Sequence, residues 1–184
     1  MNDNGHALEN FGATVNARRD TEETVCADGE YMIRCVGPDG RLKWSEVISN
    51  LVTTVGKNLI LDASLGNTAI GAVFMGLKAQ GTPVAGDTMA GHAGWNEVGS
   101  ASSPTFSGGR PSPAFSAASG GSKSCTTVTF SMTSAGTVAG CFINVAGSSA
   151  VDNTTGTLLS AGDFAAAKVV ASGDTLNVTY TLSV

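Results

Sequence analysis

The chain has 184 residues, of which 42% are hydrophobic and only 14% are charged, and its formal net charge is −5. It lacks the clustered Lys and Arg that nucleic-acid binding requires, and no apolar run reaches the roughly 18 residues of a membrane span. We therefore expect no nucleic-acid or membrane partner. The polar N-terminus has no signal-peptide pattern, so we expect maturation in a cytoplasm. The low charge suits a protein packed in an assembly, although a secreted β protein has a similar composition.

Residues 1–22 are predicted to form an extended N-terminal arm, and residues 23–184 a single β-sandwich domain. The arm has few large apolar residues and no sustained periodicity, so by itself it does not offset the entropy of its own ordering. If it is ordered, a partner has to hold it. Leu8 and Phe11 are the anchors that we expect to bind this partner.

Residues 23–48 are predicted to form a β-hairpin. Residues 30–36 alternate between apolar and polar side chains, and residues 42–48 alternate again. Gly37-Pro38-Asp39-Gly40 between them is a strong turn signal. The side chains expected to face the core are Tyr31, Ile33 and Cys35 in the first strand, and Leu42, Trp44 and, with a slip in register, Val47 in the second.

A single α-helix is predicted over about residues 52–65, where apolar residues recur at spacings of three and four. The pair Gly66-Asn67 is typical of a left-handed helix stop. Gly56 inside the helix costs about 1 kcal/mol relative to Ala, which indicates that another backbone approaches it closely. The residues that can cap the start of the helix are Asn50, Thr53 and Thr54.

The rest of the chain is predicted to consist of strands and turns. Residues 69–77 form a nearly continuous apolar run, which is typical of a strand covered on both faces, and residues 79–95 form a long loop. Further strands are expected at residues 126–132, 137–146, 157–159, 164–170 and 175–183. Short strands at this regular spacing predict a mostly β fold, an antiparallel β-sandwich or jelly roll, with one helix and the N-terminal arm added to it.

The sequence carries no motif typical of an enzyme, a cofactor site or a metal site. His6 and His92 are its only histidines, and it has neither a nucleophile elbow nor a phosphate-binding loop. Carboxylates that could form a hydrolytic pair are Asp87, Glu97, Asp163 and Asp174. The three aspartates adjoin Gly or Ala in apparent turns, which explains them without catalysis. We therefore expect no catalytic residues, no cofactor and no bound metal.

The segment 87–95, DTMAGHAGW, is the most distinctive local feature, and two interpretations fit it. In the functional one, it is a loop that presents His92 and Trp95 to a ligand. In the structural one, which we favour, Asp87 caps a tight turn over residues 88–92 and Trp95 plugs the end of the sandwich.

The four cysteines are Cys26, Cys35, Cys125 and Cys141. A cytoplasmic origin favours free thiols, which behave as small buried hydrophobic groups. A bridge between Cys26 and Cys35, on the flanks of the predicted hairpin, or between Cys125 and Cys141 stays open at this stage.

Several short motifs occur in a characteristic order along the globular part of the chain. They are NLVTTVGKN at 50–58, MGLK at 75–78, GTP at 81–83, DTMA with HAGW at 87–95, VAG with Phe142 at 138–142, GTL at 156–158, GDF at 162–164 and GDTLNVT at 173–179. In this combination, over roughly residues 40–184, the chain resembles a family of tailed-bacteriophage virion proteins.

This resemblance implies a structural virion protein and supplies no catalytic residues. It is most like capsid decoration (cement) proteins, which are often β-sandwiches that clamp neighbouring major capsid proteins. The resemblance implies a particle protein that is made in the bacterial host cytoplasm and assembled onto the virion, without saying where. The size, the strand pattern and the arm match a cement protein, so we expect a place on the capsid surface, with the major capsid protein and copies of itself, as a dimer or trimer, as partners. The alternatives are a tail, neck or fibre-attachment subunit and, from another class, a carbohydrate-binding adhesion module.

Overall fold

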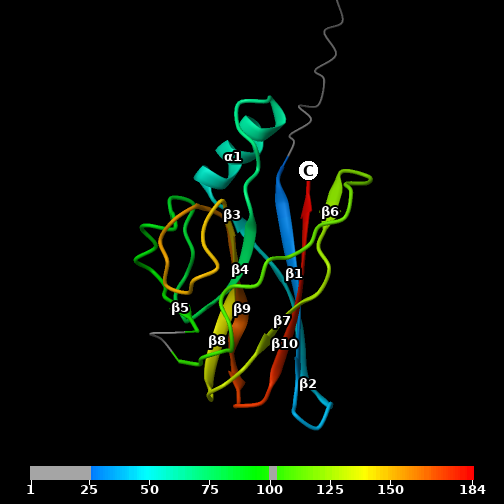
Figure 1. Ribbon diagram of the computed structural model, residues 1–184, viewed down its shortest axis with the longest axis vertical. Helices are drawn as coiled ribbons and strands as arrows, with labels where there is room; N and C mark the ends of the chain where they lie inside the picture. Colours follow the sequence, from blue (N-terminus) through cyan, green and yellow to red (C-terminus); the bar gives the residue numbers. More distant parts are fainter. Residues whose placement is uncertain (1–25, 100–102) are drawn as a thin grey trace, which may run out of the picture.

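The computed structural model of the chain describes residues 26–99 and 103–184. These residues form two antiparallel β-sheets that pack face to face as a β-sandwich, with a single helix at one end (Figure 1). The prediction of a mostly β, antiparallel sandwich with one helix is confirmed. The predicted arm over residues 1–22, with Leu8 and Phe11, lies outside the described residues and stays a prediction.

Sheet A has the strand order β2-β1-β10-β6, and β7 also pairs with β10. Its strands are β1 (Asp28–Val36), β2 (Leu42–Ser49), β6 (Ser122–Ser124), β7 (Val128–Ser131) and β10 (Thr175–Ser183). Asp28 pairs with Ser183, so the first described strand and the last strand lie side by side, and β1 begins where β10 ends (Figure 1).

Sheet B has the strand order β3-β9-β8-β4-β5. Its strands are β3 (Leu51–Val52), β4 (Val73–Lys78), β5 (Glu97–Val98), β8 (Gly136–Val145) and β9 (Thr157–Val170). Because β8 pairs with both β9 and β4 along most of its length, it forms the centre of this sheet.

The predicted hairpin is confirmed in its strands and only in part in its core residues. Tyr31, Ile33 and Cys35 are fully buried, as predicted, whereas Leu42 and Val47 are 51% and 55% exposed, so their predicted place in the core is wrong. The reason is the register, because cross-strand partners point to the same side of a sheet. Val47 pairs with the outward-facing Met32, while Trp44 pairs with Cys35 and Ile48 with Tyr31, so the inward row of β2 runs through residues 44, 46 and 48.

A small polar network joins the two sheets inside the apolar core. The Tyr31 hydroxyl lies 2.8 Å from Oγ of Ser160 on β9, and Ser160 Oγ donates to the Tyr180 hydroxyl at 3.3 Å. Asn50 donates through Nδ2 to the same Tyr180 hydroxyl at 3.0 Å. Burial raises the pKa of Tyr31 and of Tyr180, so both remain neutral hydroxyls that hold sheet A to sheet B.

Helix α1 spans Thr54–Ser64, two residues later than predicted, because residues 51 and 52 form β3 with β9 instead. Thr53 is the N-cap, and its side-chain oxygen accepts a hydrogen bond from the amide of Gly56 at 3.0 Å. Gly66 follows the helix with a φ of 78°, the left-handed conformation expected there.

Two further boundaries differ from the prediction. The strand predicted over residues 69–77 begins only at Val73. The strands predicted at 157–159 and 164–170 are one continuous strand, β9. Gly162 lies in the middle of β9 and, in the sequence, looks like a residue that interrupts a strand. It nevertheless pairs with Cys141 on β8. A Cβ at this position would lie 3.0 Å from the carbonyl oxygen of Ser49. The residue is small because sheet A approaches it closely.

Side chains of β2 close one edge of the sandwich against β9. The Trp44 indole donates to the Val169 carbonyl at 3.2 Å, and the Ala165 amide donates to a Glu46 carboxylate oxygen at 2.7 Å. Glu46 also forms an ion pair with Lys168 at 2.7 Å. Because these contacts occupy main-chain groups of β9, this stretch of the strand is a poor template for pairing with another chain.

All four cysteines are free thiols. Cys26 lies two residues before β1 and Cys35 near the end of this strand, so the hairpin does not bring them within the few ångströms that a bridge needs. Burial is the main cause that raises the pKa of the Cys35 thiol to about 11 and that of Cys141 to about 12, which keeps both protonated.

A Gly56→Ala substitution tests the close approach of α1 to β9. In an exposed helix this change is expected to stabilise by about 1 kcal/mol, but a Cβ at residue 56 would lie 2.3 Å from the Leu159 carbonyl oxygen. We expect the free energy of unfolding in urea to fall by about 1–3 kcal/mol instead. The exposed Asn58→Ala in the same helix is the matched control and is not expected to destabilise. A stabilised Gly56→Ala protein would contradict this packing.

Candidate functional site

The outer face of sheet B is covered by loops and does not form a free surface. Phe142 points away from the main core because it alternates with the core residues Cys141 and Ile143 on β8. Loop residues from 79–95 pack on it, and Trp95 is only 2% exposed. The second apolar cluster that results contains Met89, Trp95, Phe142, Leu158 and Ala161.

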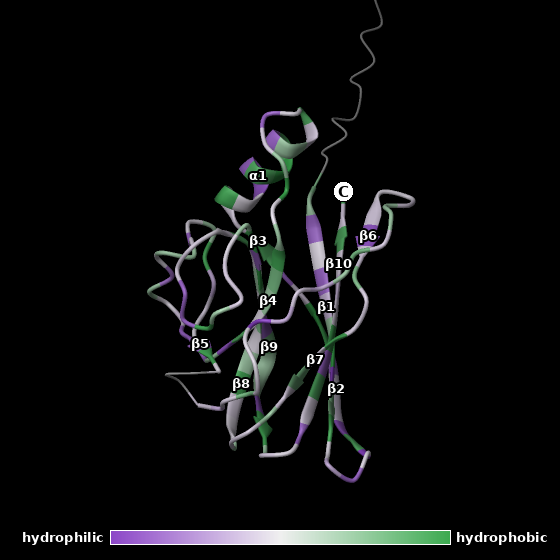
Figure 2. Ribbon diagram, viewed as in Figure 1, coloured by the Kyte–Doolittle hydropathy of each residue, from purple (hydrophilic) through white to green (hydrophobic). Residues whose placement is uncertain are grey.

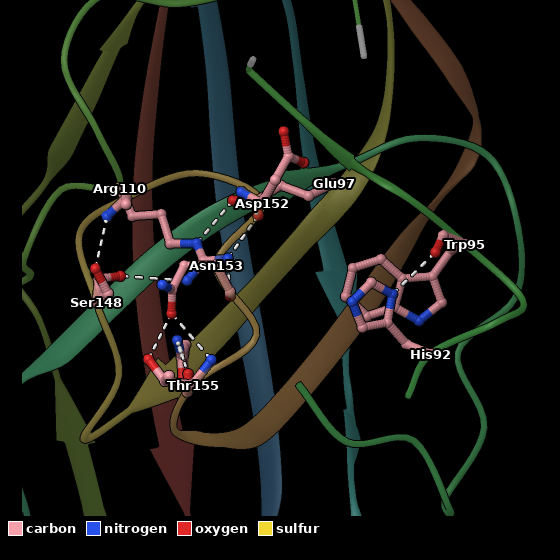
Figure 3. A network of polar contacts seen from close by, with 10 residues as sticks. His92, Trp95, Glu97, Arg110, Ser148, Asp152, Asn153 and Thr155 are labelled. Carbon is pink, nitrogen blue, oxygen red and sulfur yellow. Dashed lines mark hydrogen bonds and ion pairs between the residues drawn. The ribbon is translucent and has the colours of Figure 1, made fainter. Parts of the chain in front are cut away.

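The segment 87–95 has a structural arrangement, but not the one predicted in detail. The Asp87 carboxylate accepts from the Trp95 indole at 2.9 Å and from the Val84 amide at 3.0 Å, rather than from residues 88–92. Trp95 covers the outer face of sheet B instead of plugging the end of the sandwich. His92 stacks on Trp95 with ring centroids 4.0 Å apart, and its Nδ1 lies 2.9 Å from the Trp95 carbonyl (Figure 3).

A buried ion pair between Glu97 on β5 and Arg110 ties two loop segments to this strand beside the cluster (Figure 3). The guanidinium donates to both carboxylate oxygens, from Nε at 2.8 Å and from Nη2 at 2.6 Å. It also donates to the carbonyls of Ser148 at 3.2 Å and Asn153 at 2.8 Å, while the Asp152 amide donates to Glu97 at 2.8 Å. All of these hydrogen bonds join one part of the chain to another, so the Glu97–Arg110 pair holds the surrounding loops in place.

The Lys78 ammonium group is buried on the same face of the sheet. It forms an ion pair with Asp163 and donates to the Gly81 carbonyl at 2.6 Å. It also lies 5.7 Å from the centroid of the Trp95 ring. Asp163 is therefore part of strand β9 and of an ion pair, and its predicted place in a turn is wrong.

Asp174, by contrast, lies in the predicted turn before β10. Its carboxylate accepts from the Ala171 amide at 2.8 Å, from the Cys35 thiol at 3.7 Å, and from Lys43 in an ion pair. Burial by itself raises the pKa of Asp174, but the hydrogen bonds from Lys43 and from the Ala171 amide outweigh it and hold that pKa below its usual range.

The four carboxylates that the sequence offered as a hydrolytic pair thus each hold a structural partner: Asp87 the Trp95 indole, Glu97 the Arg110 guanidinium, Asp163 the Lys78 ammonium and Asp174 the Lys43 ammonium. In residues 26–99 and 103–184, no group of three or more His, Cys, Asp or Glu side chains is placed to hold a metal ion. None of the helices formed by these residues has the length and apolar character that crossing a membrane requires.

The outer face of sheet A is the candidate functional surface. In Figure 1 the helix and the loop segments 79–95 and 146–156 lie on the side of sheet B, away from this face. Its central row crosses three strands and consists of Val47, Met32 and Thr179, which pair side by side. Met32 is 45% and Val47 55% exposed. The next row along the strands consists of Ser45, Arg34, Asn177 and Thr129.

This face is shallow and rich in hydroxyl groups, and β1 contributes the charged residues Asp28, Glu30 and Arg34 to it. A hollow of about 390 Å³ on it is lined by Met32, Arg34, Val36, Thr127, Asn177 and Thr179. Thr129 donates to the Asn177 side-chain oxygen at 2.9 Å, and Ser124 lies 2.8 Å from Thr181 on the same side of the sheet. Neighbouring strands thus hold one another's polar side chains in place, and the face offers a preorganised polar surface.

Sequence reasoning missed this surface because it assigned Val47 to the core. The signal was present, however, since strict alternation from Tyr31 places Met32 on the opposite side from the core, and the register does the same for Val47. The predicted partner-binding residues Leu8 and Phe11 lie outside the described residues, so the structure does not place them beside this face.

Comparisons with protein-family models, with curated proteins and with solved structures find no match for this chain.

An Arg110→Met substitution tests the loop-organising ion pair. It leaves the Glu97 carboxylate buried without its cation, so we expect the free energy of unfolding to fall by about 3–5 kcal/mol. The double variant Glu97→Met/Arg110→Met removes both charges and is expected to cost less than the sum of the two single variants. Strictly additive losses in denaturant unfolding would show that the two side chains are not coupled.

An Asp174→Asn substitution tests the ion pair at the start of β10. A carboxyl whose pKa is lowered in the folded state contributes stability above its unfolded pKa, and this contribution disappears as the pH falls through the folded pKa. We expect the variant to be less stable than the parent at pH 7 and the difference to shrink below about pH 4. Unfolding curves at several pH values measure this difference in stability, with the exposed Asp62→Asn as control. A difference that grows in acid would contradict the assignment.

Proposed function

We propose that this protein is a structural virion protein that binds and reinforces the capsid shell of a tailed phage by clamping neighbouring major capsid subunits. The single observation that supports this most is the uncovered outer face of sheet A. It carries two exposed apolar side chains, Met32 and Val47, in the middle of a sheet whose other outward groups are mostly Thr, Ser and Asn.

The chemistry of this face suits contact with another protein. Protein interfaces have a central patch depleted of charge, surrounded by polar groups that pair or bind water. The charged residues of β1 are Asp28, Glu30 and Arg34, and Met32 stands between Glu30 and Arg34 in the outward row. A partner that docks on the uncharged row of Val47, Met32 and Thr179 would leave these charged groups at the rim in contact with water, which avoids the cost of burying them.

The use of charged residues elsewhere also favours a structural role. Glu97, Arg110, Lys78 and Asp163 hold loops on the outer face of sheet B, and the indole of Trp95 is bound to Asp87. The charged side chains that could take part in chemistry are thus engaged in internal contacts. An assembly protein needs a rigid body with one free face, and this division of the two sheets supplies it.

Reinforcement of a shell would follow from repetition. Stable protein interfaces bury about 1,200–2,000 Å² in total. One copy that lies across a joint between capsid subunits would contribute a modest interface, and many symmetric copies would add their contributions. The N-terminal arm, with Leu8 and Phe11, remains the predicted second point of contact with a neighbour.

The carbohydrate-binding alternative has less support. Such modules bind sugars with exposed aromatic rings. In the part of the chain that the structure describes, every aromatic side chain is buried or partly buried. Trp95 is buried, and Trp44 is partly buried with its indole bound to the Val169 carbonyl.

The combined variant Met32→Lys/Val47→Lys tests the proposed face. We expect it to lose at least about tenfold in affinity for phage particles from which the protein has been stripped, because two charges then face the interface core. Both side chains point to solvent, so the thermal midpoint of the free subunit should change little. Val84→Lys is the matched control, since Val84 is also 55% exposed but lies in the loop segment that covers sheet B. Binding that is unchanged, or lost equally in the control, would contradict the proposal.

The copy number per particle distinguishes a capsid protein from a tail, neck or fibre-attachment subunit. A cement protein repeats with the shell lattice, whereas a tail, neck or fibre-attachment subunit forms rings of about a dozen copies or fewer. Quantitative mass spectrometry of purified virions gives this ratio against the major capsid protein. A value of a dozen or fewer would replace the capsid proposal with the tail alternative.

A further inference from the structure

An apolar groove opens between the two sheets at the end of the sandwich where α1 lies. Its volume is about 260 Å³, and it receives side chains from α1, β10 and the intervening loops. Among them are Leu59, Ile60, Ile70, Phe115 and Leu182, and the one charged residue that lines it is Lys123. Pockets for small organic ligands usually measure 300–1,000 Å³ and carry several placed polar groups. This groove is smaller and nearly all apolar, so it suits one or two hydrophobic side chains.

Exposed apolar residues concentrate at the end of the molecule where this groove opens. Of the nine large hydrophobic residues exposed in the described part of the chain, four lie at this end of the molecule: Leu61, Leu65, Ile70 and Val184. Figure 2 shows the corresponding hydrophobic colour on α1 and on the ends of the neighbouring strands. A cluster of this kind, in contrast to scattered single residues, marks a surface that another group covers.

The chain enters the described structure beside the same groove. Cys26 lines an adjoining hollow of about 460 Å³ together with Ile60, Leu61 and Val184. Ile60 lines both hollows, so they lie next to each other on either side of that residue. At least 25 residues precede Cys26, and their large apolar members are few: Met1, Leu8, Phe11, Val15 and Val25.

We propose that, in the free subunit, Leu8 and Phe11 of the chain's own N-terminal segment occupy this groove. Phe11 stands 15 residues before Cys26, and a chain of that length spans at most roughly 50 Å, so it can leave the domain, reverse and return to the groove. The two side chains are spaced three residues apart and match a groove that holds one or two side chains. This inference concerns the free subunit and does not depend on the proposed capsid role.

The occupant is the chain's own segment because tethering favours it. A segment joined to the rim of its binding site through a short linker has an effective concentration in the millimolar range, well above that of a second copy in dilute solution. Lengthening such a loop adds only slowly to the entropy of closing it. Among the five large apolar residues of the segment, Leu8 and Phe11 are the two closest together in sequence, so they can enter one small groove side by side.

A photo-crosslinking experiment on the full-length free subunit tests this docking. Phe11 is replaced by the photoreactive analogue benzoylphenylalanine, and Asn4 carries the same probe in a control protein. After irradiation, the crosslinked peptides are mapped by mass spectrometry, and gels separate monomer from dimer. We expect the probe at residue 11 to react mainly with peptides that contain Ile60, Ile70 or Leu182, within the monomer band. The probe at residue 4 should show no such preference.

Hydrogen exchange gives a second measurement that needs no probe. In Leu8→Ser/Phe11→Ser, we expect amide exchange in α1 and at the end of β10 to become at least about threefold faster, while β8 is unchanged. The control is Asn4→Ser/Asn10→Ser. Crosslinks in the dimer band would assign the groove to a second copy and overturn the proposal. So would crosslinks spread evenly over the surface together with unchanged exchange. Because no phage particle is present, either result leaves the capsid proposal to its own test.

Discussion

The burial of sheet B on both faces is the constraint on which the rest of the structure depends. Its inner face packs on sheet A, and its outer face lies under irregular loops, whose main-chain amides and carbonyls need partners once water is excluded. Arg110 supplies such partners for residues 148 and 153, Glu97 for residue 152 and Lys78 for residue 81. Charged side chains are therefore placed inside the loop layer, where each is paired.

This arrangement leaves the two sheets with different roles. Sheet B carries the internal ion pairs and the second apolar cluster, and it acts as the rigid centre of the molecule. Sheet A keeps one open face, on which Met32 and Val47 lie among hydroxyl and amide groups. The edge between β2 and β9 is closed by Trp44 and Glu46, so the free surfaces are the open sheet face and the apolar end beside α1. Both are suited to contacts with protein, which is the role proposed for the chain.

The local features were predictable from the sequence because they depend on neighbouring residues. The turn at residues 37–40, the Thr53 cap and the clean alternation of β10 all appear as expected. The predictions are wrong where a distant segment of the chain determines the local structure. Residues 51 and 52 join β9 instead of the helix, Gly162 continues a strand because its partner on β8 is in register, and Val47 follows Met32 to the outside.

What the sequence by itself determined is the β-sandwich class, the single helix and which residues of β1 and β10 face the core, because a period of two in hydrophobicity directly reflects one buried face. It also indicated the close approach at Gly56, since such a costly residue within a helix needs a steric reason. Only the tertiary structure decided which sheet face stays open and which charges pair across the loops. Glu97 meets Arg110, and Lys78 meets Asp163 85 positions away, through contacts that no local pattern encodes.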